Sequence, residues 1–317
     1  MVEQVRTWRP GWPCAVGPTL RILRRGAGDP TYRTVDGALW RGIRTPDGPA
    51  ALRIVEHPDR GEVEGTAWGP GAPWVLESLP AMLGAEDDVS GFEPRHPVLV
   101  EAHRRHPHWR VTRTGLVMEA LVPAVLEQKV TGKEAFAGFR ALVYRFGERA
   151  PGPGGELGVW VQPAPTDLRM IPSWDWLRMG VDPAHSRRLL TVAARAGALE
   201  RGGVLGPEEL DRRLRSLPGI GVWTSAEVRF RALGDADAVS FSDYHVGKNI
   251  TWALTGEIDG DDDRLAALLE PWRPHRHRVQ RLIELAGLSR PRRGPRMTLP
   301  THLPADRWAQ PGMHRPR

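Results

Sequence analysis

The spacing of apolar residues changes once along this chain, near residue 97. From residue 19 to about residue 66, short apolar runs alternate with turn signals that contain glycine or proline, which predicts a small antiparallel sheet. After Pro73 a nearly helical spacing covers residues 72–84, so we expect a helix there. Residues 1–90 are therefore predicted to form a mixed α/β domain.

Beyond residue 97 the apolar positions follow a period of about 3.6 residues, the period of an α-helix. Within this part, residues 150–165 are rich in proline and glycine, which is typical of a connection between helices rather than of an element. Residues 91–288 are thus predicted to be helical. The expected fold class is mainly α with an N-terminal α/β domain.

Positive charge is concentrated at the C-terminal end of the chain. Residues 289–317 hold seven arginines and six prolines but one acidic residue, Asp306. Subtracting them from the 44 basic and 38 acidic side chains leaves 37 of each, so the rest of the chain is formally neutral. We expect a disordered basic tail, either a solvated end or an arm that raises nonspecific affinity for DNA. A DNA-binding face of the folded part has to be a local patch.

Two simple observations exclude other classes of protein. No stretch approaches about 18 consecutive apolar residues, and the first 13 residues have no apolar run, so neither a membrane span nor a secretory leader is expected. Cys14 is the only cysteine, which excludes disulfides within the chain and zinc or iron-sulfur sites built from several thiolates. These features predict a cytoplasmic protein.

Residues 207–254 contain the most informative pattern. Two amphipathic helical patterns are joined by the tight turn Leu217-Pro-Gly-Ile-Gly221. Each glycine can adopt positive φ and lets another backbone approach closely. The amides at the start of the second helix then have no intrahelical acceptor, and together with the helix dipole they favour an anion such as a phosphate. An ordinary pair of antiparallel helices is the alternative explanation of this turn.

Asp243 lies 22 residues after Gly221, in the run Val239-Ser-Phe-Ser-Asp-Tyr-His-Val. The hairpin followed by a loop and an aspartate resembles the helix-hairpin-helix (HhH-GPD) DNA glycosylases. Within them the chain looks most like the 3-methyladenine DNA glycosylase II (AlkA-like) branch, which shares the Pro-Gly-Ile-Gly-x-Trp-Thr hairpin and an Asp-Tyr pair. The resemblance covers residues 19 to about 288. It implies two helical lobes with a DNA-facing cleft between them.

The resemblance implies that Asp243 is the essential carboxylate. Cleavage of the bond between sugar and base builds positive charge on the sugar, and a carboxylate placed opposite the departing base stabilises that charge and orients or deprotonates the attacking water. Aspartate is also a preferred N-cap, so capping a helix that begins near Tyr244 is the structural alternative.

Trp223 is expected to form an aromatic wall of the base pocket, together with Tyr244, because an alkylated purine carries positive charge and stacks on aromatic faces. A plain core role is the alternative for Trp223. Glycosylases of this superfamily that also cut the strand have a lysine at the position of Trp223, and it forms a Schiff base with the sugar. Tryptophan cannot do this. We therefore expect a monofunctional enzyme that leaves an abasic site.

Other functional residues are assigned by the same resemblance. The segment Leu126-Glu-Gln-Lys-Val-Thr-Gly is similar to a helix start that lines the cleft and bears a glutamine. Lys129 falls where the family places an apolar wedge, and Glu284 where it can place a stacking tryptophan, so the pocket is open to a different lesion. Ser242 stands where an acid precedes the essential aspartate. The expected DNA contacts are Gln128, Lys129, Gly219, Gly221, Thr224, His245, Lys248 and Arg276.

No cofactor is expected to be required. The resemblance implies a monovalent cation, sodium or potassium, held by the main-chain carbonyls of Arg215, Leu217 and Ile220. The expected partner is double-stranded DNA with a damaged base, bound by a monomeric cytoplasmic protein that joins the nucleoid when it binds DNA. The alternatives are a glycosylase for oxidised or deaminated bases, a DNA-binding protein that has lost catalysis, and a hydrolase of small nucleosides.

Overall fold

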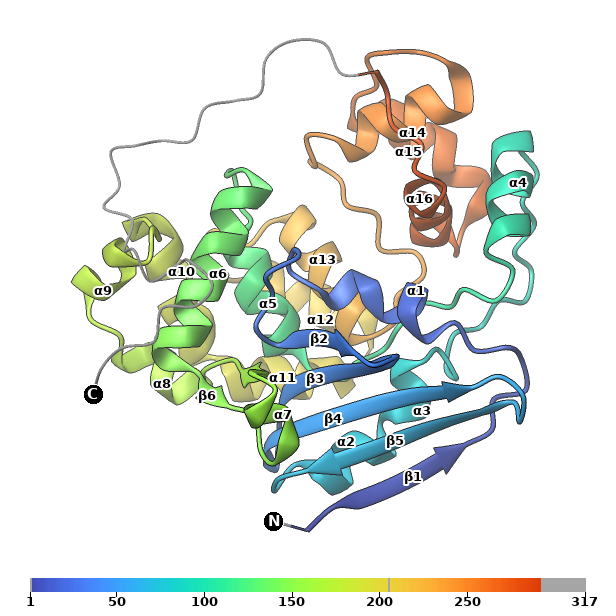
Figure 1. Cartoon of the computed structure of the whole chain (residues 1–317). Coiled ribbons are helices and arrows are strands. Elements are labelled where there is room, and N and C mark those ends of the chain that lie inside the picture. The colour runs from blue at the N-terminus through green and yellow to red at the C-terminus, as the bar shows by residue number, and fades with distance from the viewer. Residues whose placement is uncertain (1, 205, 292–317) are drawn as a thin grey trace.

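A computed structural model describes residues 2–204 and 206–291 (Figure 1). The N-terminal part is a five-stranded antiparallel sheet with strand order β1-β5-β4-β3-β2. This confirms the predicted small antiparallel sheet. The strands are β1 (Gln4–Trp8), β2 (Tyr32–Val35), β3 (Ala38–Thr45), β4 (Gly48–His57) and β5 (Glu62–Trp68). Strand β1 was not expected from the sequence, because its residues alternate in burial without forming an apolar run.

Helices pack against one face of this sheet. They are α1 (Val16–Leu20), η1 (Arg21–Leu23), α2 (Ala72–Glu77) and α3 (Leu79–Met82), and α1, α2 and α3 contribute to the same core cluster as the central strands. The helix expected over residues 72–84 is divided at Ser78. Pro80 explains this division, because it has no N–H with which to continue the helical hydrogen bonds.

The opposite face of the sheet packs on the short hairpin of β6 (Glu148–Arg149) and β7 (Trp160–Val161), with α7 (Pro153–Glu156) between them. Residues 150–165 therefore contain regular elements, contrary to the expectation of a bare connection. The rings of Trp40 and Trp68 stack at 5.5 Å between centroids in this layer. Burial of these apolar rings offsets the low propensity of a stretch rich in glycine and proline.

The helices after the sheet form two groups, as the resemblance implied. One group shares a single apolar core. It contains α5 (Val117–Leu126), α6 (Gly132–Phe146), α8 (Pro165–Met170), α9 (Ser173–Arg178), α10 (Pro183–Ala194), α11 (Ala196–Val204), α12 (Pro207–Arg215) and α13 (Val222–Ala232). Within the described residues, no helix is both long and apolar enough to cross a membrane.

The second group has its own core and lies at the upper right of Figure 1. It contains α4 (Pro97–Arg105), α14 (Val246–Thr255), α15 (Asp262–Leu269), η2 (Glu270–Trp272) and α16 (Arg276–Leu285). Helix α4 packs on α16. This group therefore combines one helix that precedes α5 in the sequence with the helices that follow α13. The boundary expected at residue 90 lies between α3 and α4. Apart from residues 289–291, the predicted tail falls outside the described residues.

His277 is a buried titratable group at the junction of the two groups. Its ring stacks on Phe230 at 4.1 Å, and neither ring nitrogen has a hydrogen-bond partner within the described part of the chain. Burial, together with the neighbouring charges of Arg281, Arg231 and Arg278, holds the pKa of His277 well below its ordinary value of 6.5. The folded protein therefore keeps this imidazole neutral.

We expect acid to destabilise the protein through His277. Below pH 6.5 only the unfolded chain takes up the proton, so the free energy of unfolding falls by up to about 1.4 kcal/mol per pH unit as the pH decreases further. Denaturant unfolding at pH 7.5 and pH 5.5 measures this loss. His277→Phe, which keeps an aromatic ring beside Phe230, should reduce the loss by about 1 kcal/mol. An unchanged pH dependence in the variant would contradict this assignment.

Candidate functional site

The expected helix-hairpin-helix is present and consists of α12, residues 216–221 and α13. The turn is closed by the amide of Ile220, which donates to the carbonyl of Leu217 at 3.1 Å. Helix α13 has Gly221 as its N-cap, so the amides of its first turn have no acceptor within the helix. These amides and the helix dipole give the hairpin the properties of an anion site.

The two hairpin glycines differ in their surroundings. Gly219 has a φ of +81°, and a Cβ built on it would lie 2.4 Å from Nε of Arg188. Gly221 has a φ of −99°, and no described heavy atom beyond its chain neighbours comes within 4 Å of a Cβ built there. Only Gly219 is therefore required by backbone conformation and by a close approach.

Arg188, from α10, was not singled out in the sequence. Its side chain lies directly on the hairpin at Gly219, and its guanidinium forms no hydrogen bond or ion pair with another described residue. A sequence signal for Arg188 is lacking, because it is one of many arginines and its position over the hairpin depends on how α10 packs. This places a cation beside the predicted phosphate-binding amides.

Gln128 connects the loop between α5 and α6 to the hairpin. Its side-chain amide donates to the carbonyl of Gly219 at 3.1 Å and to Oγ1 of Thr224 at 2.7 Å, and Nε2 of His185 lies 2.7 Å from its main-chain oxygen. The structure thus brings together three residues predicted at separate places in the sequence. The hydroxyl of Thr224 is buried and supports the hairpin from inside.

Lys129 follows in the same loop. Its side chain is exposed, and its φ of +54° lies in the left-handed region. Residues other than glycine are uncommon in this conformation, and such strain is concentrated at binding and catalytic sites. The exposed amino group beside Gln128 is consistent with the predicted contact to DNA.

Asp243 contacts the hairpin helix. Its Oδ2 accepts a hydrogen bond from Nε1 of Trp223 at 3.1 Å, and its Oδ1 accepts from the amides of His245 at 2.7 Å and Val246 at 3.0 Å. The two alternatives for this aspartate, catalysis and capping, therefore involve different oxygen atoms. The N-cap of α14 is His245, and the two hydrogen bonds of Oδ1 at the start of this helix fix the orientation of the carboxylate, while Oδ2 faces the indole of Trp223.

Tyr244, predicted to belong to the base pocket, is 69% exposed. The amino group of Lys248 lies 4.3 Å from the centroid of its ring, and the ring of His245 contacts it edge-on at 4.9 Å. All three residues surround the start of α14, where Tyr244 precedes the first helical turn. They form an exposed aromatic and cationic surface next to Asp243.

Arg276 has a different partner from the one expected. Its guanidinium donates two hydrogen bonds to Asp237, at 2.8 Å and 2.6 Å, and its side chain is 11% exposed. The same carboxylate accepts from the amide of Arg276 at the start of α16. Because this bidentate pair occupies the guanidinium, Arg276 holds the 235–245 segment against α16 rather than presenting a free cation to phosphate.

The proposed cation ligands lie where α12 ends. Arg215 is the last residue of the helix, and the final carbonyls of a helix have no intrahelical donor and lie at its negative end. Leu217 and Ile220 follow in the turn, where the carbonyl of Leu217 already accepts one amide. Neutral carbonyl oxygens of this kind fit a sodium or potassium ion. Bound there, it would add positive charge to the hairpin.

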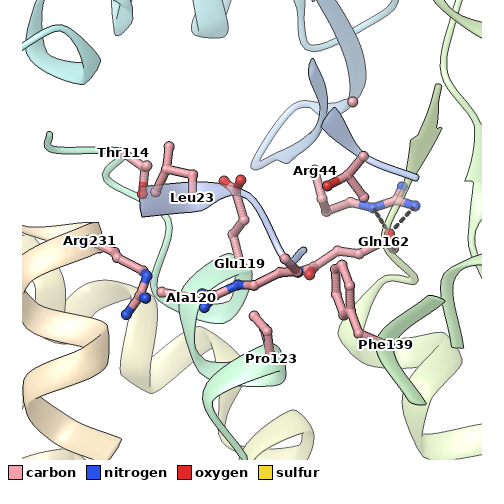
Figure 2. Close-up of a pocket in the computed structure, with 12 residues that line it drawn as sticks. Leu23, Arg44, Thr114, Glu119, Ala120, Pro123, Phe139, Gln162 and Arg231 are labelled. Carbon is pink, nitrogen blue, oxygen red and sulfur yellow. Dashed lines mark hydrogen bonds between the residues drawn. The ribbon is translucent and has the colours of Figure 1, made fainter. Parts of the chain in front are cut away.

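Figure 2 shows a small pocket lined by residues from β3, α5, α6 and α13. Charged and polar side chains line it, among them Arg44, Glu119 and Arg231, and Arg44 donates to the main-chain oxygen of Gln162. None of the residues predicted for the site belongs to its lining. The pocket is therefore separate from the surface that joins the hairpin to Asp243.

Among known proteins, no family model and no curated protein matches this chain, but solved structures do. The 3-methyladenine DNA-glycosylase from Archaeoglobus fulgidus matches with a TM-score of 0.73 at 18% identity, covering 88% of this chain and 97% of its own. The apo form of the 8-oxoguanine glycosylase/lyase from Clostridium acetobutylicum gives 0.68 at 11% identity, with 90% and 97% covered.

A third solved structure is the 3-methyladenine DNA glycosylase from Schizosaccharomyces pombe in complex with abasic DNA. It gives a TM-score of 0.50 at 19% identity, covering 63% of this chain and 95% of its own. Similarity at these identities establishes the fold. The chain has the helix-hairpin-helix fold shared by these DNA glycosylases, with a small antiparallel sheet and two groups of helices.

Proposed function

We propose that this protein is a monofunctional DNA glycosylase that hydrolyses the N-glycosidic bond of a damaged base, favouring alkylated bases, and leaves an abasic site in double-stranded DNA. The observation that carries the proposal is the hydrogen bond between Trp223 and Asp243. It places a carboxylate oxygen at the start of the same helix whose first amides form the predicted phosphate site.

The geometry supports two separate roles: the hairpin binds the DNA backbone, and the carboxylate of Asp243 acts on the sugar. A base in a duplex hides its glycosidic bond, so the nucleotide has to rotate out of the stack while the backbone is held in place. The hairpin amides near Gly219 hold the phosphate, and Gln128 keeps the hairpin fixed to the loop that presents Lys129. Asp243 then stabilises positive charge on the sugar and orients the water that attacks it. A cation at the carbonyls of Arg215, Leu217 and Ile220 would strengthen the phosphate site.

The identity of residue 223 supports hydrolysis without strand cleavage. An indole has no amine that could form a Schiff base with the sugar, and its N–H already donates to Asp243. The 3-methyladenine glycosylase of Archaeoglobus fulgidus gives a TM-score of 0.73, against 0.68 for the 8-oxoguanine glycosylase/lyase of Clostridium acetobutylicum. A glycosylase for oxidised guanine is the second candidate, because the resemblance places Glu284 where the family can have a stacking tryptophan and the 8-oxoguanine glycosylase/lyase of Clostridium acetobutylicum has the same fold.

The test is release of free base from duplexes with one defined lesion each: 3-methyladenine, 7-methylguanine, 8-oxoguanine or hypoxanthine. We expect release of a methylated base, with strand breaks only after alkali treatment of the abasic product. Breaks without alkali would contradict the monofunctional assignment, and release of 8-oxoguanine alone would favour the second candidate. Duplex binding without release of any base would identify a DNA-binding protein that has lost catalysis.

Arg188 is expected to contact the phosphate that the hairpin binds. Removing one cation from a phosphate contact lowers the slope of log K against log [salt] by about 0.9, so Arg188→Ala should weaken binding to all duplexes alike and reduce the salt slope by about one. The matched control is Arg187→Ala, which removes an exposed arginine from the adjacent position of α10. Fluorescence anisotropy at several salt concentrations measures both. An unchanged slope in Arg188→Ala would show that the guanidinium does not touch DNA.

A further inference from the structure

Asp243 stands at the end of a strained turn. The amide of Asp243 donates to the carbonyl of Ser240 at 3.3 Å, which closes a four-residue turn over residues 240–243. Within it, Ser242 has a φ of +66°, a left-handed conformation that is unfavourable for a residue with a Cβ. Such a conformation persists only where the surrounding structure determines it. The contacts of Ser242 and Ser240 therefore decide where the carboxylate of Asp243 lies.

The carboxylate of Asp262 binds Ser242, the residue with the left-handed conformation. The two oxygens of this carboxylate accept from the amide of Ser242 at 2.9 and 3.0 Å, and one of them also accepts from the hydroxyl of Ser242 at 3.1 Å. Asp262 is the first residue of α15, but capping of that helix is performed by Asp261, which accepts from the amide of Arg264 at 2.8 Å. The side chain of Asp262 is thus directed to the turn rather than to its own helix.

Ser240 anchors the other end of the turn in the protein interior. It is 1% exposed, its amide donates to Oε1 of Gln280 at 3.2 Å, and its hydroxyl donates to Oε1 of Glu227 at 2.7 Å. Gln280 comes from α16 and Glu227 from α13, one helical turn after Trp223. The turn is therefore attached to three helices, and α13 contacts it twice, through Glu227 and through Trp223.

We propose that Asp262 is a positioning residue that forces Ser242 into its left-handed conformation and thereby keeps Oδ2 of Asp243 against Trp223. This inference rests on the proposed function of Asp243. Because Ser240 is immobilised by buried hydrogen bonds, the conformation at Ser242 sets the direction in which the chain continues to Asp243. Without the carboxylate of Asp262, Ser242 relaxes to negative φ and Asp243 moves away from the indole.

Four variants test the proposal: Asp262→Ala, Asp262→Asn, Ser242→Gly, and Asp262→Ala combined with Ser242→Gly. Glycine adopts positive φ without strain, so the double variant should keep the left-handed conformation at residue 242 without the carboxylate of Asp262. Asparagine keeps one acceptor for the amide of Ser242. The matched control is Asp263→Ala, which removes a charge from the same first turn of α15 and thus the same interaction with the helix dipole.

The measurements are the single-turnover rate constant for base release, the affinity for a duplex with an abasic-site analogue, and the NMR resonance of the indole N–H of Trp223. A misplacement of about 1 Å costs up to about 100-fold in rate. We expect Asp262→Ala to lower the rate constant 10- to 100-fold with affinity unchanged within about threefold, and Asp262→Asn to lie between it and wild type. The double variant should recover at least half of the loss on a logarithmic scale, and Asp263→Ala should match wild type.

The indole resonance separates this inference from the proposed function. If the wild-type protein releases no base, the Trp223 resonance still reports the hydrogen bond to Asp243. A shift of this resonance in Asp262→Ala that is reversed in the double variant supports the proposed role of Asp262. A wild-type rate and a wild-type resonance in Asp262→Ala would overturn the proposal. A double variant no better than Asp262→Ala would also overturn it, because the role of Asp262 would then not be the conformation of Ser242.

Discussion

Asp243→Asn is expected to lower the rate of base release by about 100- to 1,000-fold, with affinity for damaged duplex unchanged within about threefold. Removing one preorganised group that stabilises transition-state charge has an effect of this size. Asparagine has the same shape and can still accept the amides of His245 and Val246 through its oxygen. The hydrogen bonds at the start of α14 are therefore preserved, whereas the negative charge opposite the sugar and the acceptor for Nε1 of Trp223 are lost, because Nδ2 of asparagine is a donor.

Single-turnover release of base, binding to an abasic-site duplex and thermal unfolding together decide the role of Asp243. Asp243→Ala should lose the charge and all three hydrogen bonds of the carboxylate, so its unfolding free energy should fall by about 1 kcal/mol or more, and that of Asp243→Asn, which keeps the two bonds from the amides, should fall less. Asp263→Asn provides a control for the loss of a nearby negative charge. Full activity in Asp243→Asn would mean that this aspartate only stabilises the start of α14.

Gly219→Ala is expected to weaken DNA binding by about tenfold and to destabilise the fold by about 1–3 kcal/mol. The left-handed φ of +81° is unfavourable for alanine. Its Cβ would also lie 2.4 Å from Nε of Arg188, so either the arginine or the hairpin has to move. Both the phosphate-binding amides and the adjacent cation are then displaced.

Gly221→Ala supplies the matched comparison. Residue 221 has a φ of −99° and space for a Cβ within the protein, so alanine there should leave stability close to wild type, and a loss of affinity would report only the close approach of DNA at this predicted contact. Anisotropy titrations with an undamaged duplex and denaturant unfolding measure the two effects. Equal losses in the two variants would show that the hairpin requires glycine only for close approach of DNA, and not for the backbone conformation of Gly219 or its contact with Arg188.

The sheet, the helical character after residue 97 and the helix-hairpin-helix could be predicted because each depends on local spacing. Alternating short runs predict strands, a 3.6-residue period predicts helices, and Leu217-Pro-Gly-Ile-Gly221 specifies a tight turn through its own backbone preferences. Errors arose where packing overrides local preference. Strand β1 exists because β5 offers it hydrogen-bond partners, and β7 exists because its apolar residues cover the sheet.

The prediction of the site residues also depended on local pattern, and the contacts between them on packing. The hairpin pattern and the family resemblance together selected Asp243, Trp223 and Gln128 as candidates, and the structure joins Asp243 to Trp223 and Gln128 to Gly219. The sequence could not assign the two oxygens of Asp243 to Trp223 and to α14, since these contacts join separate elements. Nor could it show that Asp237 occupies the guanidinium of Arg276.

Local pattern thus determines the elements of this protein and the residues able to perform chemistry, because helical period, turn geometry and side-chain type act over a few residues. Tertiary structure alone decides which of those residues meet. Arg188 lies on Gly219 because α10 packs beside the hairpin, and Asp262 reaches Ser242 because α15 folds back over the turn that precedes α14. Such contacts depend on the burial of apolar faces far apart in the chain, and no window of a few residues contains that information.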